Sequence, residues 1–462
     1  MNDATGIDAA ARASRSRLGV AFLVSIVGVL ALDWRLGDAI EVVAAWVGLG
    51  AIAGAIAGRA GLAWIAVPAA FLLYPGRVAL GLAAGLGPWW LLQAALVAIA
   101  LAGGFALGAT FGPGRTPWVV VRRSWVGAGR TQRIIAAAAI AVPLLAFSGY
   151  VGYVAVVGSD MFTHPDRDRN CTTPDQKYGW KYEAINYDIA DDARLAVESA
   201  NSAACSSQGA EAGTAVVSPD GVRIAGWYIP AGDGSPPTGP TIVIVHGWHG
   251  NKSGMLRYAA PLHQRFNVVL VDLRDNGRSG PADVTMGVRE QTDLEAMLDW
   301  LEANKHPEWL GAVGNSMGGA TVLAAAAHDQ RIRAVLLEST HASLITSGGN
   351  IAENEHGYPA QPTGWAIAIG ASWRIGTDVT SVDPMRTITQ LGSRPVLLIH
   401  GTADEVDYPA TSAELNLHAA LEAGVPASLV YCPNGPHGKS VDVCPDLWTS
   451  AANAFFSEAA GR

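Results

Sequence analysis

The sequence predicts a helical membrane domain followed by an α/β domain whose sheet is mostly parallel. The N-terminal third of the chain contains five apolar stretches, which is typical of membrane-spanning helices. The rest alternates short apolar runs with amphipathic segments, the pattern of a doubly wound sheet covered by helices. We therefore assign residues 1–158 to an all-helical transmembrane domain of about five helices, 159–213 to an extracytoplasmic linker and 214–462 to the α/β domain.

The overall composition limits the classes of partner. The chain has 462 residues, 50% of them hydrophobic, and a formal net charge of -9. A nucleic-acid-binding surface is normally basic, so we expect no nucleic-acid partner. The composition carries no signal for an oligomeric state.

The five apolar stretches differ in length. They are residues 18–32, 42–58, a stretch beginning near Leu62, 89–111 and 134–157. A span needs about 20 mainly apolar residues, which the last two stretches provide. The first is short and alone would resemble a signal peptide, but four further stretches follow it. The third contains Pro75, Gly76 and Arg77 and is either one kinked helix or two half-helices.

Arginines in the connecting loops predict the orientation of the membrane domain. They gather before the first stretch and between the fourth and fifth, at Arg12, Arg15, Arg17, Arg115, Arg122, Arg123, Arg130 and Arg133. Basic loops stay in the cytoplasm, so five spans place the N-terminus inside and the α/β domain outside the cell membrane. The helices are interpreted as an anchor rather than a transport pathway, with the lipid bilayer as a partner.

The strands and helices of the α/β domain follow one another in a regular order. A hairpin is predicted over 215–231, with Asp220 and Gly221 as its turn. Strands are expected at 241–247, 267–274, 310–316, 333–339, 394–401 and 426–433, and helices at 293–304, after Ser316, at 411–424 and at the C-terminus. A short helical cap is expected at about 341–380. Active sites in such sheets lie at the carboxyl ends of the strands, so candidate residues are sought there.

The pattern Gly314-Asn315-Ser316-Met317-Gly318 follows one of these strands. A serine hydroxyl becomes a nucleophile when a sharp strand-to-helix turn exposes it and a base takes its proton. The glycines on either side of Ser316 permit that turn. An ordinary glycine turn is the alternative, but the position between a buried strand and a small-residue helix favours a nucleophile.

An oxyanion hole requires a second backbone N–H from the loop after an earlier strand. His246-Gly247-Trp248 ends the strand at 241–247, so we predict the amides of Trp248 and Met317 as the donors. His246 and His249 form an H-x-x-H pair, but no acidic residue lies nearby. We expect structural roles for both histidines and no metal or cofactor.

The acid and the base should follow later strands, in the chain order nucleophile, acid, base. Asp404 lies three residues after Gly401 and is the predicted acid, with Asp407 and Glu338 as alternatives. His437 follows the last strand and is the predicted base. The acid would hold the imidazole tautomer while the histidine moves the proton.

Four cysteines, all in the second part of the chain, suggest disulfides in an oxidising compartment. They are Cys171, Cys205, Cys432 and Cys444, with no C-x-x-C zinc pattern. Four cysteines allow three disulfide pairings, and four unlinked thiols are a further alternative. We favour the hypothesis that Cys432 pairs with Cys444, which would restrain the loop of His437 and leave Cys171 with Cys205.

On these residues the chain resembles the α/β-hydrolase superfamily, nearest to Bem46-like membrane-anchored hydrolases and to the catalytic domains related to prolyl oligopeptidases. The matching motifs are "DGVRIAGWYIPA", "VIVHGWHGNKS", "VDLRDNGRSG", "GNSMGG", "RPVLLIHGTADEVDYP" and "GPHG", in this order. Asp275 and Asn276 stand where relatives often have Gly-His or Gly-Phe. The resemblance covers roughly 216–456 and does not extend to the membrane part.

The resemblance implies a serine hydrolase that cleaves carboxylic esters or thioesters of small-molecule or lipid-like substrates through an acyl-enzyme. A prolyl-oligopeptidase-like peptidase is one alternative, although the sequence has no β-propeller segment. A non-catalytic membrane sensor or scaffold is a third, because fold does not fix function. Trp365 and Trp373 in the cap are expected either to form an acyl-binding wall or only to pack the cap.

Overall fold

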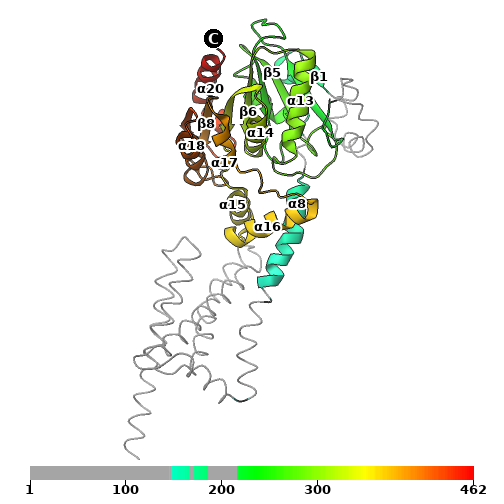
Figure 1. Ribbon diagram of the computed structural model, residues 1–462, viewed down its shortest axis with the longest axis vertical. Helices are drawn as coiled ribbons and strands as arrows, with labels where there is room; N and C mark the ends of the chain where they lie inside the picture. The colour runs from blue at the N-terminus through cyan, green and yellow to red at the C-terminus, as the bar shows by residue number, and fades with distance from the viewer. Residues whose placement is uncertain (1–128, 130–144, 146, 167–169, 186–215, 462) are drawn as a thin grey trace, which may run out of the picture. The chain divides into compact units, whose positions relative to one another are not determined.

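The computed structural model describes residues 129, 145, 147–166, 170–185 and 216–461 (Figure 1). The chain divides into two units, residues 1–151 and 152–462. The predicted spans lie outside the described residues, apart from the end of the fifth stretch. Within the described residues, no helix combines the length and the apolar character that crossing a membrane requires.

The second unit is built on a mostly parallel sheet, as the sequence predicts. Among the described residues it has nine strands in the order β1-β3-β5-β4-β6-β7-β8-β9, with β2 paired to β3. The pairs from β5 to β9 are parallel, whereas β3 runs antiparallel to β5. The strands are β1 (Glu183–Ile185), β2 (Val216–Val217), β3 (Arg223–Ile229), β4 (Thr241–Val245), β5 (Asn267–Asp272), β6 (Leu310–Asn315), β7 (Ile332–Glu338), β8 (Val396–Gly401) and β9 (Ala427–Cys432).

Helices cover both faces of the sheet (Figure 1). They are α8 (Ser159–Thr163), α9 (Pro174–Tyr178), α12 (Lys252–Ala259), α13 (Glu290–Asn304), α14 (Met317–His328), α15 (Leu344–His356), α16 (Ala360–Ile375), α17 (Pro384–Ile388), α18 (Ala413–Glu422), α19 (Ser440–Val443) and α20 (Pro445–Ala459), with a π-helical turn η2 (Val154–Gly158) and 3-10 turns η4 (Thr389–Leu391) and η5 (Pro409–Thr411). Alternate residues of β4 enter opposite cores: Val243 packs with α13 and α14, and Ile244 packs with α12 and α20. Both faces of the strand are therefore buried, which explains its uninterrupted apolar sequence.

The segment predicted as a linker contributes to the α/β unit. Its described part contains α8, α9 and β1, and β1 adds an edge strand by pairing Glu183 with Tyr228 and Ile185 with Gly226. The predicted hairpin is confirmed, because Val216 pairs with Ile224 across the turn at Asp220 and Gly221. The unit boundary at residue 151 lies seven positions before the predicted end of the membrane domain.

The predicted cap range, 341–380, contains the closely packed helices α15 and α16. A side chain at Gly349 would place its Cβ 2.4 Å from the carbonyl oxygen of Ala360. At Gly364 the Cβ would lie 2.1 Å from the carbonyl oxygen of Ile345. Only glycine permits these backbones to approach so closely, so the two helices pack as a pair.

Candidate active site

Ser316 occupies a strained turn between β6 and α14. Its φ of 52° and ψ of -119° place a non-glycine residue at positive φ. The turn depends on neighbouring glycines: a Cβ at Gly314 would lie 2.4 Å from the Cα of Gly319, and a Cβ at Gly318 would lie 2.5 Å from the carbonyl oxygen of His246. Backbone strain of this kind costs about 1–3 kcal/mol and is held where the surrounding packing determines it. The result presents a half-buried hydroxyl at the edge of the sheet.

The structure brings together the three predicted catalytic side chains, each from a different loop. His437 Nε2 lies 2.9 Å from Ser316 Oγ, and His437 Nδ1 lies 3.0 Å from both carboxylate oxygens of Asp404. Asp404 follows β8 and His437 follows β9, so both lie at the carboxyl ends of parallel strands. This geometry allows the imidazole to accept the serine proton while the carboxylate holds the opposite ring nitrogen.

The charges around the imidazole determine its pKa. Burial of His437 favours the neutral ring, but the hydrogen bond that its Nδ1–H donates to Asp404 and the negative charges of Asp407 and Asp404 outweigh burial and raise the pKa. For Asp404, burial acts to raise the pKa, and the hydrogen bond and charge of His437 lower it overall. Asp404 is therefore a carboxylate at neutral pH, and the imidazolium that forms during proton transfer is stabilised.

Asp404 is fixed by its own loop and by a second histidine. Its Oδ1 accepts hydrogen bonds from the amides of Val406 and Asp407 at 3.1 and 2.8 Å. His400 Nε2 lies 3.3 Å from Asp404 Oδ2 and 2.5 Å from the carbonyl oxygen of Asp407. Sequence reasoning missed His400, since a buried histidine within a strand has no motif that marks it.

Asp407 and Glu338, the two alternative candidates for the catalytic acid, lie in other positions. Asp407 Oδ2 is 3.9 Å from His437 Nδ1, and its carboxylate accepts a hydrogen bond from Ser347 on α15. Burial raises the pKa of Asp407 to about 7. Glu338 accepts hydrogen bonds from the Ser440 amide and the Trp448 indole, both at 2.8 Å. Glu338 therefore tethers the chain that follows His437, and Asp404 is the carboxylate in direct contact with the imidazole.

The predicted oxyanion loop passes beside the serine. A Cβ at Gly247 would lie 3.1 Å from the Cβ of Ser316. Within the described part of the chain, neither the Trp248 amide nor the Met317 amide donates to a protein acceptor. The Trp248 side chain donates to the carbonyl oxygen of Phe162 through its indole Nε1, over 3.1 Å. Sequence reasoning did not foresee this contact with the segment that follows the fifth apolar stretch.

The two histidines of the H-x-x-H pair contact backbone groups. His246 Nε2 accepts a hydrogen bond from the Leu273 amide at 3.0 Å, and His246 Nδ1 lies 2.7 Å from the Gly247 carbonyl oxygen. His249 Nδ1 lies 2.8 Å from the carbonyl oxygen of Asp166. These bonds position the loops around the serine, in keeping with the structural role expected for both rings.

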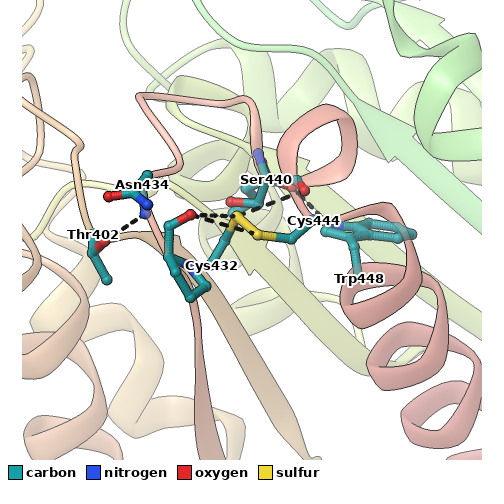
Figure 2. Close-up of a disulfide and its surroundings, with 8 residues drawn as sticks. Thr402, Cys432, Asn434, Ser440, Cys444 and Trp448 are labelled. Carbon is teal, nitrogen blue, oxygen red and sulfur yellow. Dashed lines mark hydrogen bonds between the residues drawn. A yellow bond between two sulfur atoms is a disulfide. The ribbon is translucent and has the colours of Figure 1, made fainter.

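A disulfide restrains the loop of His437. Figure 2 shows Cys432 at the end of β9 bonded to Cys444 at the start of α20, with Cα atoms 5.8 Å apart. The Asn434 amide donates to Thr402 Oγ1 at 2.8 Å and ties the same loop to the end of β8. The predicted pairing of Cys432 with Cys444 is confirmed. Cys171 is disulfide-bonded as well, and its predicted partner, Cys205, lies outside the described residues.

Comparisons with known proteins agree with this architecture. The family of the alpha/beta hydrolase fold matches residues 240–367. YfhR of Escherichia coli O157:H7, an uncharacterized protein, is 32% identical over 222 residues, which cover 47% of this chain and 70% of YfhR. YqkD of Bacillus subtilis, also uncharacterized, is 28% identical over 233 residues, or 49% of this chain and 73% of YqkD. The chain belongs to the α/β-hydrolase family.

Among solved structures, the Pyrococcus furiosus esterase Pf2001 is similar with a TM-score of 0.47 and 19% identity. The similarity covers 64% of this chain and 98% of the esterase.

Proposed function

We propose that this α/β hydrolase cleaves carboxylic esters or thioesters through a Ser316–His437–Asp404 triad and an acyl-enzyme intermediate. The observation that carries the proposal is the unbroken hydrogen-bonded line from the Ser316 hydroxyl through His437 to Asp404, with separations of 2.9 and 3.0 Å. A nucleophile in contact with a base, and a base oriented by a third group, is the arrangement that acyl transfer requires.

The reaction would begin with attack of Ser316 Oγ on the substrate carbonyl carbon while His437 Nε2 takes the hydroxyl proton. The carbonyl oxygen becomes an oxyanion, which the amides of Trp248 and Met317 would stabilise. The tetrahedral intermediate collapses to the acyl-enzyme, and the leaving alcohol or thiol takes the proton from His437. A water then gives its proton to His437 and attacks the acyl carbon, and the acid product leaves as Ser316 regains its proton.

The amides of Trp248 and Met317 have no acceptor among the described residues, which supports their role as oxyanion donors. Two backbone N–H groups that have no acceptor within the described residues lie on the loop beside Ser316 and at the first position of α14. Such amides favour a negative oxygen that appears only during reaction, because they require no reorganisation when the charge develops. The N-terminal end of α14 adds a partial positive charge at the same place.

We further propose that residues 1–158 anchor the hydrolase in the cell membrane, with the catalytic unit on the extracytoplasmic side. The apolar stretches and the arginine-rich loops of the sequence support this proposal. The Cys432–Cys444 disulfide supports the side of the membrane, because disulfides persist in oxidising compartments. Fusion of reporter enzymes to the C-terminus tests it: an enzyme that needs an oxidising compartment should be active, and one that needs the cytoplasm should not.

Labelling by a fluorophosphonate probe tests the catalytic proposal. The full chain should be labelled once, and the Ser316→Ala protein should lose both the label and ester hydrolysis. A matched control is Ser450→Ala, which alters an exposed serine on α20 and should keep both. Intact labelling of Ser316→Ala would contradict the assignment of the nucleophile. Short esters, long-chain esters, thioesters and dipeptide amides then define the preferred bond.

A further inference from the structure

We propose that the outer surface of the cap lies against the lipid bilayer, so that the catalytic unit rests on the membrane. The cap face is defined by six exposed side chains: Tyr153, Val156, Met161, Trp365, Ile369 and Trp373. The inference rests on the proposed membrane anchor. The cap face would give the protein a second contact with the bilayer, made by the catalytic unit itself.

Three large apolar side chains lie on one side of α16. Trp365, Ile369 and Trp373 follow one another at intervals of four residues, which places them in one row along a helix. They are 53%, 62% and 86% exposed. Neither tryptophan therefore packs the interior of the cap. The small residues of the same helix, including Ala366 and Gly370, are buried.

The segment that follows the fifth apolar stretch extends this surface. A Cβ at Gly370 would lie 1.9 Å from the carbonyl oxygen of Ala155, and a Cβ at Gly158 would lie 3.2 Å from the side chain of Ile367. Gly370 thus lets the backbones of η2 and α16 meet, and Gly158 leaves room for the Ile367 side chain. Tyr153, Val156 and Met161 remain exposed just before η2, on η2 and on α8, and both η2 and α8 contact α16.

The charged residue of α16, Arg374, has an oppositely charged partner on α8. Arg374 follows Trp373 directly, and its Nη1 lies 2.9 Å from Asp160 Oδ1 on α8. The Nη2 of Arg374 donates to the carbonyl oxygen of Val156 at 3.1 Å. Both charged side chains stay partly exposed, at 35% and 57%, but each has its opposite charge beside the exposed Trp373 and Val156. A surface of this kind gains free energy by leaving water.

The position of the surface along the chain identifies a bilayer as its occupant. Val156 and Val157 are the last residues of the apolar stretch 134–157, which we propose as the final span. A surface that begins where a span ends is held at the depth of the lipid headgroups. Tryptophan and tyrosine are enriched at that depth because their rings are apolar and their N–H and O–H groups remain hydrated. The row on α16 then lies in the interface plane.

The cap face is connected to the catalytic loops through α15. Asn350 donates to the Val406 carbonyl oxygen at 2.8 Å, and Asn354 donates to the Glu405 carbonyl oxygen at 2.6 Å, so α15 is fixed to the loop of Asp404. Helix α16 packs on α15 from the other side. Docking of the cap face would therefore hold the acid loop at a fixed short distance from the bilayer.

Nitroxide labelling of an introduced cysteine tests the proposal in the full chain, reconstituted in phosphatidylcholine bilayers. The cysteines of the described residues are all disulfide-bonded, so the label should report the introduced position, and the unsubstituted protein gives the background. Trp373→Cys probes the cap face, and Ile369→Cys repeats the measurement one turn away. Glu458→Cys, exposed on α20 at the far end of the catalytic unit from α16, is the matched control (Figure 1).

We expect the labels at 373 and 369 to be accessible to oxygen, which concentrates in lipid, and at least fivefold less accessible than the label at 458 to a water-soluble nickel chelate. Equal accessibility of all three positions to the nickel chelate would overturn the proposal. A label at 373 shielded from both reagents would overturn it as well, because protein rather than lipid would then cover the face. Hydrolysis plays no part in this readout, and retention of the chain in carbonate-washed membranes reports the anchor separately.

Discussion

The indole Nε1 of Trp248 donates a hydrogen bond to the carbonyl oxygen of Phe162 over 3.1 Å, and the two rings lie 5.6 Å apart. Trp248 belongs to the loop that carries a proposed oxyanion amide. Phe162 belongs to α8, which follows the last apolar stretch of the chain. The geometry around the nucleophile therefore depends on α8, a helix outside the segment that carries the predicted catalytic motifs.

Trp248→Phe should lower turnover without abolishing the fold. The variant keeps an aromatic ring but leaves the Phe162 carbonyl oxygen without its donor, which costs about 1–3 kcal/mol when the group is buried. Freed of this bond, the loop would hold its amide less accurately, and misplacement by about 1 Å can cost up to two orders of magnitude in rate. We expect kcat for a soluble ester to fall about tenfold or more, with a smaller change in KM.

Trp300→Phe is the matched control. Trp300 is buried on α13, and its indole nitrogen has no hydrogen-bond partner within the described residues. The same substitution there removes an N–H group without breaking a bond, so kcat should stay within about twofold. Equal losses in both variants would show that the effect at Trp248 comes from the ring and not from its hydrogen bond.

The two aspartates near His437 should respond differently to the same isosteric substitution. Asp404→Asn removes the carboxylate that contacts both the imidazole and the loop amides, so kcat should fall by about four orders of magnitude. Asp407→Asn changes a carboxylate 3.9 Å from His437 Nδ1, and its activity should stay within about tenfold. Measurement of kcat for both variants, with folding checked by circular dichroism, decides which of the two aspartates is the catalytic acid. A larger loss in Asp407→Asn would transfer the role of acid to Asp407.

The pH dependence of hydrolysis should follow the protonation of His437. The imidazole acts as a base only when it is neutral, so kcat/KM should rise with pH and reach half its maximum above the ordinary histidine pKa of 6.5, because that pKa is raised. The negative charge of Asp407 contributes to the raised pKa of His437. Asp407→Asn should therefore shift the midpoint to lower pH. A midpoint that moves upward, or that does not move, would contradict the electrostatic account.

Buried strands could be predicted from the sequence because both of their faces are apolar, as in Thr241–Val245. The edge strand β1 could not be predicted in this way. It has three residues, and its pairing with β3 comes from a tertiary contact rather than from a local pattern. Helix α12 was also not predicted, because its first turn buries Lys252 and Ser253 and thereby hides the apolar periodicity.

The candidate site also contains residues that the sequence predicts and residues that it does not. Ser316 and His437 could be selected from their positions after strands and from their order in the chain. The choice between Asp404 and Asp407 depends on the three-dimensional turn in which Asp404 accepts the amides of Val406 and Asp407. Contacts from distant segments, such as Phe162 on Trp248, have no sequence signal at all.

Removal of the Cys432–Cys444 disulfide should lower stability and leave a slower enzyme. The bridge closes a loop with a sequence separation of 12, and a cross-link of this size stabilises a protein by about 3 kcal/mol on the chain-entropy model. The double variant Cys432→Ser, Cys444→Ser should therefore lose activity at a lower temperature than the wild type. Its kcat should also fall, because His437 lies within the loop that the bridge restrains.

Thermal inactivation of both proteins with and without dithiothreitol checks the cause: the reductant should destabilise the wild type more than the variant. An unchanged inactivation temperature in the double variant would show that the hydrogen bonds of Asn434 and Ser440 are sufficient to hold the loop.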